Sequence, residues 1–262
     1  MATLAWRLAA ALPDSPAGLL SPAAARQRTS LETRGHRPFP PPDGGWVMGQ
    51  TWRRLLFAHW AIAPEDMRAL VPDQLPLDLY NGRAWLGVTP FEMEGVRPRG
   101  APPAPFVSRF PELNVRTYVM RDGRPGIHFF SLDTSNRPTV AGARSLYRLP
   151  YFRARMAIRA RDGWIEYAHR RSPEVAFVAR YRPTGPAAFA APGTLEHWLT
   201  ERYCAYAVDA GRVLRIDIHH RPWELQPAEA EIAANSVAPL PLAGAPHLMY
   251  AARQDIVVWP PR

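Results

Sequence analysis

A segment near the middle of the chain contains the side chains best suited to acid–base or anion-binding chemistry. It starts at Phe110 and reads FPELNVRTYVMRDGRPGIHFFSLDTS. Asp122-Gly123 is typical of a two-residue hairpin turn, which requires positive φ. Pairing the two strands outward from this turn places Glu112 opposite Asp133. Because side chains alternate along a strand, we expect one face to carry two carboxylates, an amide, a guanidinium and a hydroxyl. These belong to Glu112, Asn114, Arg116, Ser131 and Asp133.

Two interpretations of this polar face are open. The opposite face is apolar, with residues such as Leu113, Val115 and Phe130. An antiparallel pair with one apolar face commonly exposes its polar face to water. Alternatively, the polar face lines a cavity. In that case a glutamate can act as a general base or acid, and an arginine can hold an anionic group.

The elements that would position this hairpin are mostly strands. The 30 prolines and the alternating apolar runs favour many short strands and few long helices. We expect strands over residues 84–93, 139–147, 156–161 and 164–169, among others. Helices are expected near residues 195–204, where Thr194 is a suitable N-cap, and near residues 229–234.

Two regions differ in composition. Residues 1–34 are rich in Ala, Leu and Pro, and we expect a disordered N-terminal extension there. Residues 35–262 are expected to form a single domain. The chain of 262 residues is 47% hydrophobic, which suits a globular core.

Charge and cysteine content narrow the class of protein. The net charge is +9, yet the chain contains no lysine, and its arginines are scattered rather than clustered with aromatic residues. We therefore do not expect a nucleic-acid partner.

No stretch approaches the roughly 20 apolar residues of a membrane span, so no membrane association is expected. Cys204 is the only cysteine, which excludes an internal disulfide and fits a cytoplasmic protein.

Neither a metal nor a cofactor is expected. His219 and His220 are adjacent, so on a strand they point to opposite faces and are poorly placed for one ion. The chain also lacks the glycine-rich fingerprints of nucleotide and dinucleotide sites.

Several segments resemble a known family. MRALVP at residues 67–72, followed by Leu75, Leu77 and Asp78, resembles an early motif of the acetoacetate decarboxylase superfamily, and residues 144–152 resemble its later Pro-Lys-Lys segment. QTWRRLLFAHW, FPELNVRTYV, LEHWLTERYC and IHHRPWELQPAEAE are similar to the YqjF-like proteins, a bacterial-type family of unknown function in that superfamily. The resemblance covers about residues 35–262.

The resemblance implies a mainly β (α+β) fold. We expect an antiparallel, cone-like β-barrel of the acetoacetate decarboxylase type, with a few flanking helices and an internal small-molecule cavity. It also implies that Glu112 and Arg116 face inward. Relatives with this fold commonly oligomerise, so we expect a homodimer.

The lysines of the decarboxylases are replaced in this chain. In those enzymes the first lysine of Pro-Lys-Lys forms a Schiff base with the ketone, and the second lowers its pKa. Tyr151 and Phe152 stand at these positions, and Ser145 stands where the family has a glutamate, whereas Arg144 matches. Because the chain has no lysine at all, Schiff-base catalysis through a side chain is excluded, and so is the true acetoacetate decarboxylase activity that needs it.

Two functions from different classes remain open. The first is a lyase- or isomerase-type acid–base enzyme acting on a small oxo or carboxylate compound, with Glu112 as base or acid and Tyr151 as hydrogen-bond donor. Its anionic ligand would be held by the residues Arg116, Arg144, Ser131 and His128. His128 can join only if the hairpin bulges, because the simple register places it on the other face. The second is a non-catalytic small-molecule-binding protein that kept the cavity.

Overall fold

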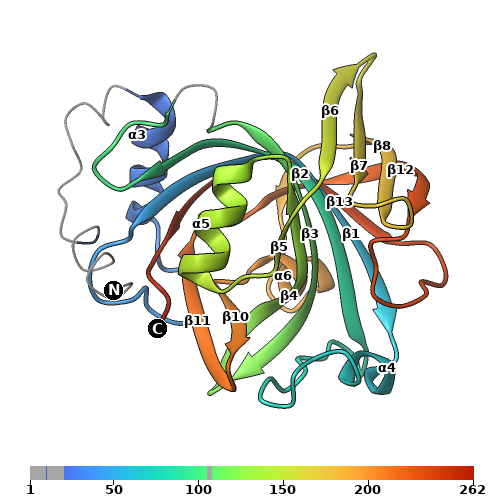
Figure 1. The fold of residues 1–262 in the computed structure, drawn as a ribbon, viewed down its shortest axis with the longest axis horizontal. Coiled ribbons are helices and arrows are strands. Elements are labelled where there is room, and N and C mark those ends of the chain that lie inside the picture. Colours follow the sequence, from blue (N-terminus) through green and yellow to red (C-terminus); the bar gives the residue numbers. More distant parts are fainter. Residues whose placement is uncertain (1–9, 11–20, 105–107) are drawn as a thin grey trace.

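The strands form one mixed, mostly antiparallel sheet, part of which closes on itself as a ring (Figure 1). The computed structural model describes residue 10, residues 21–104 and residues 108–262. The ring runs in the order β1-β2-β3-β4-β10-β11-β13, and pairing of β1 with β13 closes it. Its strands are β1 (Met48–Ile62), β2 (Ala84–Pro98), β3 (Phe110–Arg121), β4 (Arg124–Thr134), β10 (Cys204–Asp209), β11 (Arg212–His219) and β13 (His247–Val258). The expected mainly β fold is therefore confirmed.

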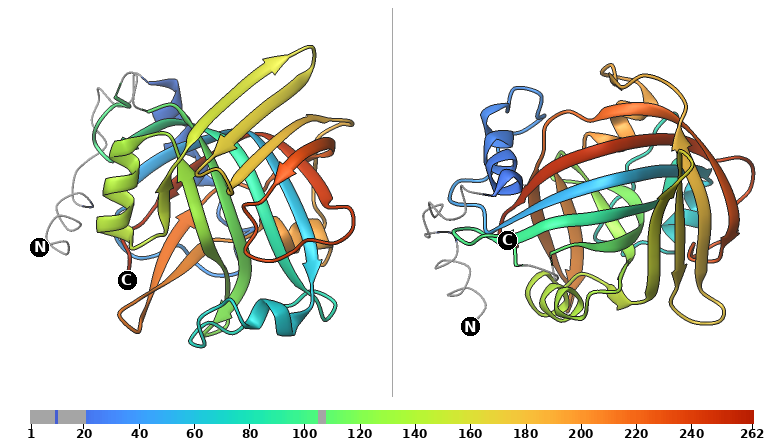
Figure 2. Two further views of the ribbon diagram at one scale, coloured as in Figure 1. Left: turned by 45° about the vertical axis from the view of Figure 1, so that its right-hand side comes forward. Right: turned by 90° about the horizontal axis from the view of Figure 1, so that it is seen from above.

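Further strands extend the sheet beyond the ring. They are β5 (Tyr151–Arg153), β6 (Arg155–Arg161), β7 (Trp164–Arg170), β8 (Ala176–Pro183), β9 (Ala188–Phe189) and β12 (Glu224–Asn235). β12 continues from β13 to β8, β7 and the edge strand β6. The β6–β7 hairpin projects away from the ring (Figures 1 and 2). One apolar core lies inside the ring, around Phe57, Phe91 and Phe129, and another lies between the ring and β7 and β8, around Val115, Tyr167 and Phe177.

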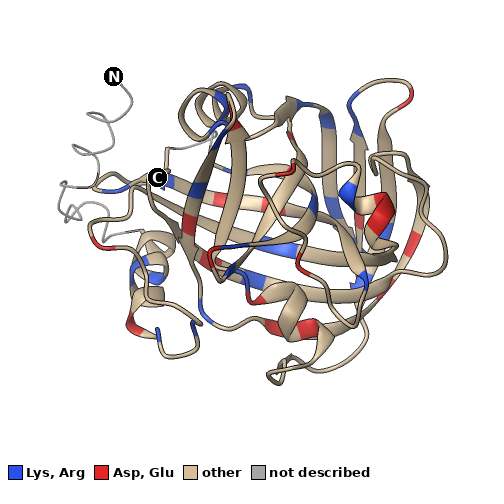
Figure 3. Cartoon of the chain, turned by 90° about the horizontal axis from the view of Figure 1, so that it is seen from below, with Lys and Arg blue, Asp and Glu red and all other residues tan. Residues whose placement is uncertain are grey.

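The helices in the described part of the chain are short. They are α3 (Pro22–Thr29), the 3-10 helix η1 (Ser30–Glu32), α4 (Pro64–Arg68), α5 (Arg137–Tyr147) and α6 (Leu195–Thr200). None of these described helices has the length and apolar character needed to cross a membrane. Basic and acidic positions are spread over many elements rather than gathered on one (Figure 3).

The hairpin forms at the predicted turn but contains a bulge. Asp122 and Gly123 have φ values of 51° and 71°, as the turn requires. Arg116 pairs with Phe129, but Val115 pairs with Ser131, so Phe130 is an extra residue in β4. A one-residue bulge turns every residue beyond it to the other face. Glu112 is consequently opposite Thr134, not Asp133.

Two predicted elements have the wrong type. Residues 139–147, predicted as a strand, belong to helix α5, because Asn136 caps the helix by accepting a hydrogen bond from the Thr139 amide and a proline occupies its first turn. Residues 229–234, predicted as a helix, belong to strand β12. There Glu229 and Glu231 form ion pairs with arginines of β8, so pairing with that strand outweighs helix propensity.

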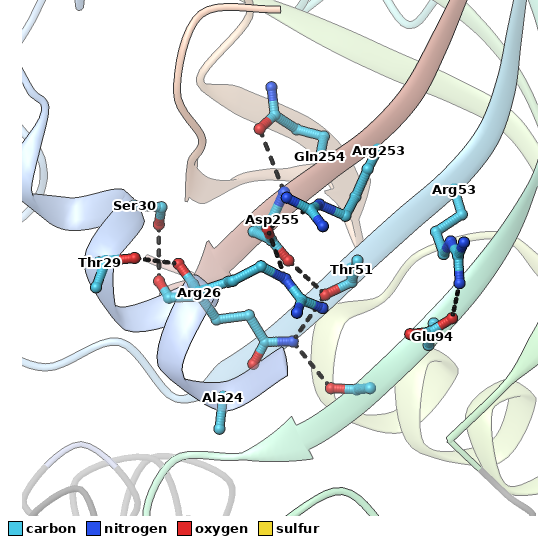
Figure 4. A network of polar contacts seen from close by, with 12 residues as sticks. Ala24, Arg26, Thr29, Ser30, Thr51, Arg53, Glu94, Arg253, Gln254 and Asp255 are labelled. Carbon is cyan, nitrogen blue, oxygen red and sulfur yellow. Dashed lines mark hydrogen bonds and ion pairs between the residues drawn. The ribbon is translucent and has the colours of Figure 1, made fainter. Parts of the chain in front are cut away.

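The expected disordered extension does not hold for residues 21–34. Helix α3 packs on β1 and β13, and Gln27 is fully buried. Figure 4 shows the polar contacts that hold it: Arg26 forms an ion pair with Asp255, which also accepts a hydrogen bond from Thr51. The rest of the expected extension, apart from residue 10, lies outside the described residues.

Candidate functional site

A cavity of about 460 Å³ lies within the ring of strands, beside α5. Every strand of the ring contributes at least one lining residue, and α5 supplies several more. Most of these residues are apolar, including Trp52, Phe110 and Phe129 on strands and Ala143 and Leu146 on α5. Within the described part of the chain, the lining contains one carboxylate, Glu112, and no arginine. The cavity is therefore suited to a small molecule that is largely apolar.

Glu112 is the acidic group of this cavity. Its side chain is only 2% exposed, and its Oε1 accepts a hydrogen bond of 3.1 Å from the Tyr151 hydroxyl. Its Oε2 has no hydrogen-bond partner among the described residues. Burial raises the pKa of Glu112 to about 8, and the charge of Asp133 adds to this, whereas the Tyr151 hydrogen bond opposes it. Glu112 is therefore mostly a neutral acid at pH 7 and ionises under mildly alkaline conditions.

Tyr151 reaches Glu112 through a parallel strand contact. β5 pairs with β4 so that Tyr151 is next to Leu132, which is itself opposite Asn114 on β3. Burial raises the pKa of Tyr151 well above its ordinary value, and the neighbouring Glu112 raises it further. The phenol therefore stays protonated and orients the carboxyl group.

Further polar residues line the cavity, and two of them, Asn114 and Tyr147, are buried. Asn114 is 3% exposed, and its Oδ1 has no partner among the described residues. It follows Glu112 by two positions on β3, so both side chains are on the same face. Tyr147, at the end of α5, is also buried in the lining. The strand prediction for residues 139–147 did not identify Tyr147 as a lining residue. The helical spacing of Val140, Ala143 and Tyr147 could have indicated that these side chains share one face.

The two predicted anion-binding arginines are near the cavity but do not line it. Arg116 shares the face of Glu112 and Asn114, but its guanidinium packs 5.4 Å from the Phe57 ring and 5.8 Å from the Tyr118 ring. Arg144, on α5, donates a hydrogen bond of 2.6 Å from Nε to the backbone oxygen of Tyr151. It therefore positions β5 rather than facing a ligand.

Ser131 and His128 are on the opposite face of the hairpin. The bulge turns Ser131 toward Val115 and the core outside the ring, where its hydroxyl has no partner among the described residues. His128 lies between the bulge and the turn, so the bulge does not move it to the Glu112 face. Its Nδ1 is 3.1 Å from the backbone oxygen of Tyr206, and burial lowers its pKa.

The bulge also carries Asp133 away from the cavity. Asp133 is fully buried, and its Oδ2 is 2.7 Å from His169 Nε2 and from Arg171 Nη2. These contacts tie β4 to β7 and to the residue that follows β7. Among the described residues, no group of three His, Cys, Asp or Glu side chains is arranged to hold a metal ion.

Solved structures share this fold. Acetoacetate decarboxylase from Legionella pneumophila has a TM-score of 0.57 and 12% identity, covering 86% of this chain and 92% of that one. The enduracididine biosynthesis enzyme MppR, complexed with pyruvate, has a TM-score of 0.55 and 9% identity, covering 87% and 92%. At these identities the likeness establishes the acetoacetate decarboxylase-like fold.

Sequence comparison establishes the family. Residues 49–255 match the DUF2071 family, described as an uncharacterized conserved protein. The uncharacterized protein YqjF of Bacillus subtilis (strain 168) is 46% identical over 228 residues, which cover 84% of this chain and 94% of that protein. These matches show that the chain, which has an acetoacetate decarboxylase-like fold, belongs to the YqjF-like DUF2071 family.

Proposed function

We propose that this protein is an acid–base enzyme that removes a proton from the carbon next to the carbonyl group of a small, uncharged oxo compound. The observation that carries the proposal is the state of Glu112: a buried carboxyl group at the cavity wall, with a pKa of about 8 and one oxygen that lacks a partner among the described residues. A carboxylate with a raised pKa is a stronger base than an ordinary one, and a value near neutrality suits proton transfer.

Asn114 supplies the second group that this chemistry needs. Removing the proton moves negative charge onto the carbonyl oxygen, and an amide N–H can donate a hydrogen bond to it. Positions two apart on a strand are about 7 Å apart along the backbone. That spacing leaves room for a carbonyl compound between Glu112 and Asn114, with its acidic carbon near one and its oxygen near the other.

The cavity wall favours an uncharged substrate. An anionic ligand was expected from Arg116 and Arg144, yet neither lines the cavity, and burying an unpaired anion beside Glu112 would be costly. MppR, with the same fold, was solved with pyruvate, which supports an oxo compound as the substrate class. The absence of lysine from the chain excludes an iminium formed on a side chain.

One observation favours a second candidate, a binding protein without catalysis. Glu112 is the single carboxylate in the described lining, and the pKa of each lining tyrosine is raised above its ordinary value. A cavity with one titratable group near neutrality can bind a carbonyl compound by donating a hydrogen bond from the neutral acid, with no reaction following.

Proton exchange in D₂O distinguishes the two candidates. Cyclohexanone and acetophenone are incubated with the protein, and loss of their α-proton signals is followed by NMR, with pyruvate as the anionic comparison. Wild type should accelerate exchange of the uncharged ketones, with a rate that rises with pH through about 8. Glu112→Gln keeps the shape and a hydrogen-bond donor but cannot take a proton, so exchange should fall about 100-fold or more.

Ser131→Ala is the matched control, because Ser131 is on the same hairpin but faces away from the cavity. It should retain the exchange rate of wild type. Equal exchange by wild type and Glu112→Gln would refute the enzyme. Ketone binding by both proteins with no exchange by either would favour the binding protein.

A further inference from the structure

An arginine-lined depression lies outside the ring, at the base of the projecting β6–β7 hairpin. Its volume is about 440 Å³. It is lined by Arg153, Ala154, Arg155, Arg170, Arg171, Ser172 and Pro173. Four of these seven residues carry a guanidinium, and this lining includes no acidic side chain. The depression is separate from the Glu112 cavity, with which it shares no lining residue.

Arg171 is fixed in place before any ligand binds. Its Nε and Nη2 donate hydrogen bonds of 3.1 and 2.7 Å to Asp133 Oδ2, and its guanidinium lies 4.2 Å from the centre of the Phe152 ring. Asp133 is fully buried, so it anchors Arg171 from inside the protein. A guanidinium held in this way loses little side-chain entropy when it binds an anion.

The other three arginines have no such partner. Arg153, Arg155 and Arg170 are exposed, and their guanidinium groups form no hydrogen bond or ion pair with any residue that the structure describes. Arg155 and Arg170 are directly opposite each other in the β6–β7 pairing. Like charges at directly opposite positions destabilise a sheet. The hairpin therefore keeps an unfavourable concentration of positive charge at its base.

The neighbouring strand shows that the same sheet neutralises arginines elsewhere. On β8, Arg180 forms an ion pair with Glu231, and Arg182 forms one with Glu229. The lining of the depression contains no comparable acid. Its arginines therefore differ from those of β8, whose charges are balanced by glutamates of the neighbouring strand. An anion supplied from solution would provide the missing counter-charge.

We propose that this depression binds a small, multiply charged phosphate anion, such as a diphosphate or the phosphate end of a phosphorylated metabolite. The planar guanidinium matches pairs of phosphate oxygens, and several converging arginines match a group with more than one negative charge. The volume is suited to a compact anion.

Calorimetric titration with inorganic pyrophosphate tests the site. Wild type is compared with the double variant Arg155→Gln/Arg170→Gln, in which both residues are exposed, so the fold should be retained. Wild type should bind pyrophosphate, and the double variant should bind at least about tenfold more weakly. In phosphate-free, low-salt buffer the double variant should also melt no lower than wild type, because the like-charge contact has been removed.

The matched control is Arg159→Gln/Arg161→Gln, which removes the same charge from the same hairpin outside the depression. Its pyrophosphate affinity should stay within about twofold of wild type. An equal loss of affinity in both double variants would overturn the proposal, because it would show attraction to general surface charge. No measurable binding of pyrophosphate to wild type would also overturn it.

Discussion

Replacing Glu112 by glutamine should remove a pH-dependent loss of stability. The pKa of Glu112 is raised from the ordinary 4.5 to about 8 in the folded protein. Between these values the folded state holds a proton that the unfolded state has released, so the free energy of unfolding falls as pH rises. Each tenfold difference in proton affinity corresponds to about 1.36 kcal/mol, so the full effect approaches about 5 kcal/mol above pH 8. Glutamine is neutral at every pH, so the free energy of unfolding of the variant does not fall with pH for this reason.

Urea unfolding at pH 5, 7 and 9 measures this effect. Glu112→Gln and wild type should have similar stability at pH 5, and the variant should be more stable by about 3 to 5 kcal/mol at pH 9. The control Glu224→Gln changes an exposed carboxylate and should leave the pH dependence of wild type unaltered. If the stability difference between Glu112→Gln and wild type is the same at pH 5 and pH 9, Glu112 is not a buried acid with a raised pKa.

Three further predictions concern residues around the hairpin and the N-terminal helix. Tyr151→Phe removes the hydrogen bond that lowers the pKa of Glu112, so the pH at which the stability loss levels off should move above about 8; an unchanged upper limit would count against the contact. Ser131→Ala should raise the free energy of unfolding by about 1 kcal/mol, because it removes a buried hydroxyl with no partner among the described residues, and a clear loss in urea unfolding would contradict this. A protein lacking residues 1–34 should be less stable than one lacking residues 1–20 by about 2 to 4 kcal/mol, because the longer deletion also removes the buried contacts of α3. Equal melting temperatures of the two truncated proteins would show that α3 does not stabilise the fold.

The hairpin shows how far local sequence patterns reach. Asp122-Gly123 determines the turn, because few other residues tolerate positive φ at both positions. Pairing near the turn, including that of Arg116 with Phe129, follows the predicted register. The predicted register assumed unbroken alternation through β4 and so missed the bulge at Phe130. The sequence does carry a signal, because the apolar–polar alternation changes phase at the adjacent Phe129 and Phe130. An extra residue there reverses which face each later residue occupies.

Secondary structure outside the hairpin was decided by competition between local and tertiary preferences. The alternating sequence of β12 contains helix-favouring Ala and Glu, yet ion pairs with β8 and a long paired length stabilise the strand. In α5 the local signals, Asn136 as N-cap and a proline in the first turn, favoured the helix, and the strand prediction overlooked them.

The sequence by itself determined the family, the mainly β fold, the central hairpin and the absence of a Schiff-base lysine, because each depends on residue identity or on neighbours along the chain. Tertiary structure decided the candidate site. Tyr151 meets Glu112 only through the parallel pairing of β5 with β4, and the bulge sends Asp133 to Arg171 instead of to the cavity. The raised pKa of Glu112 likewise comes from its burial inside the closed ring, a property of the whole fold rather than of any segment.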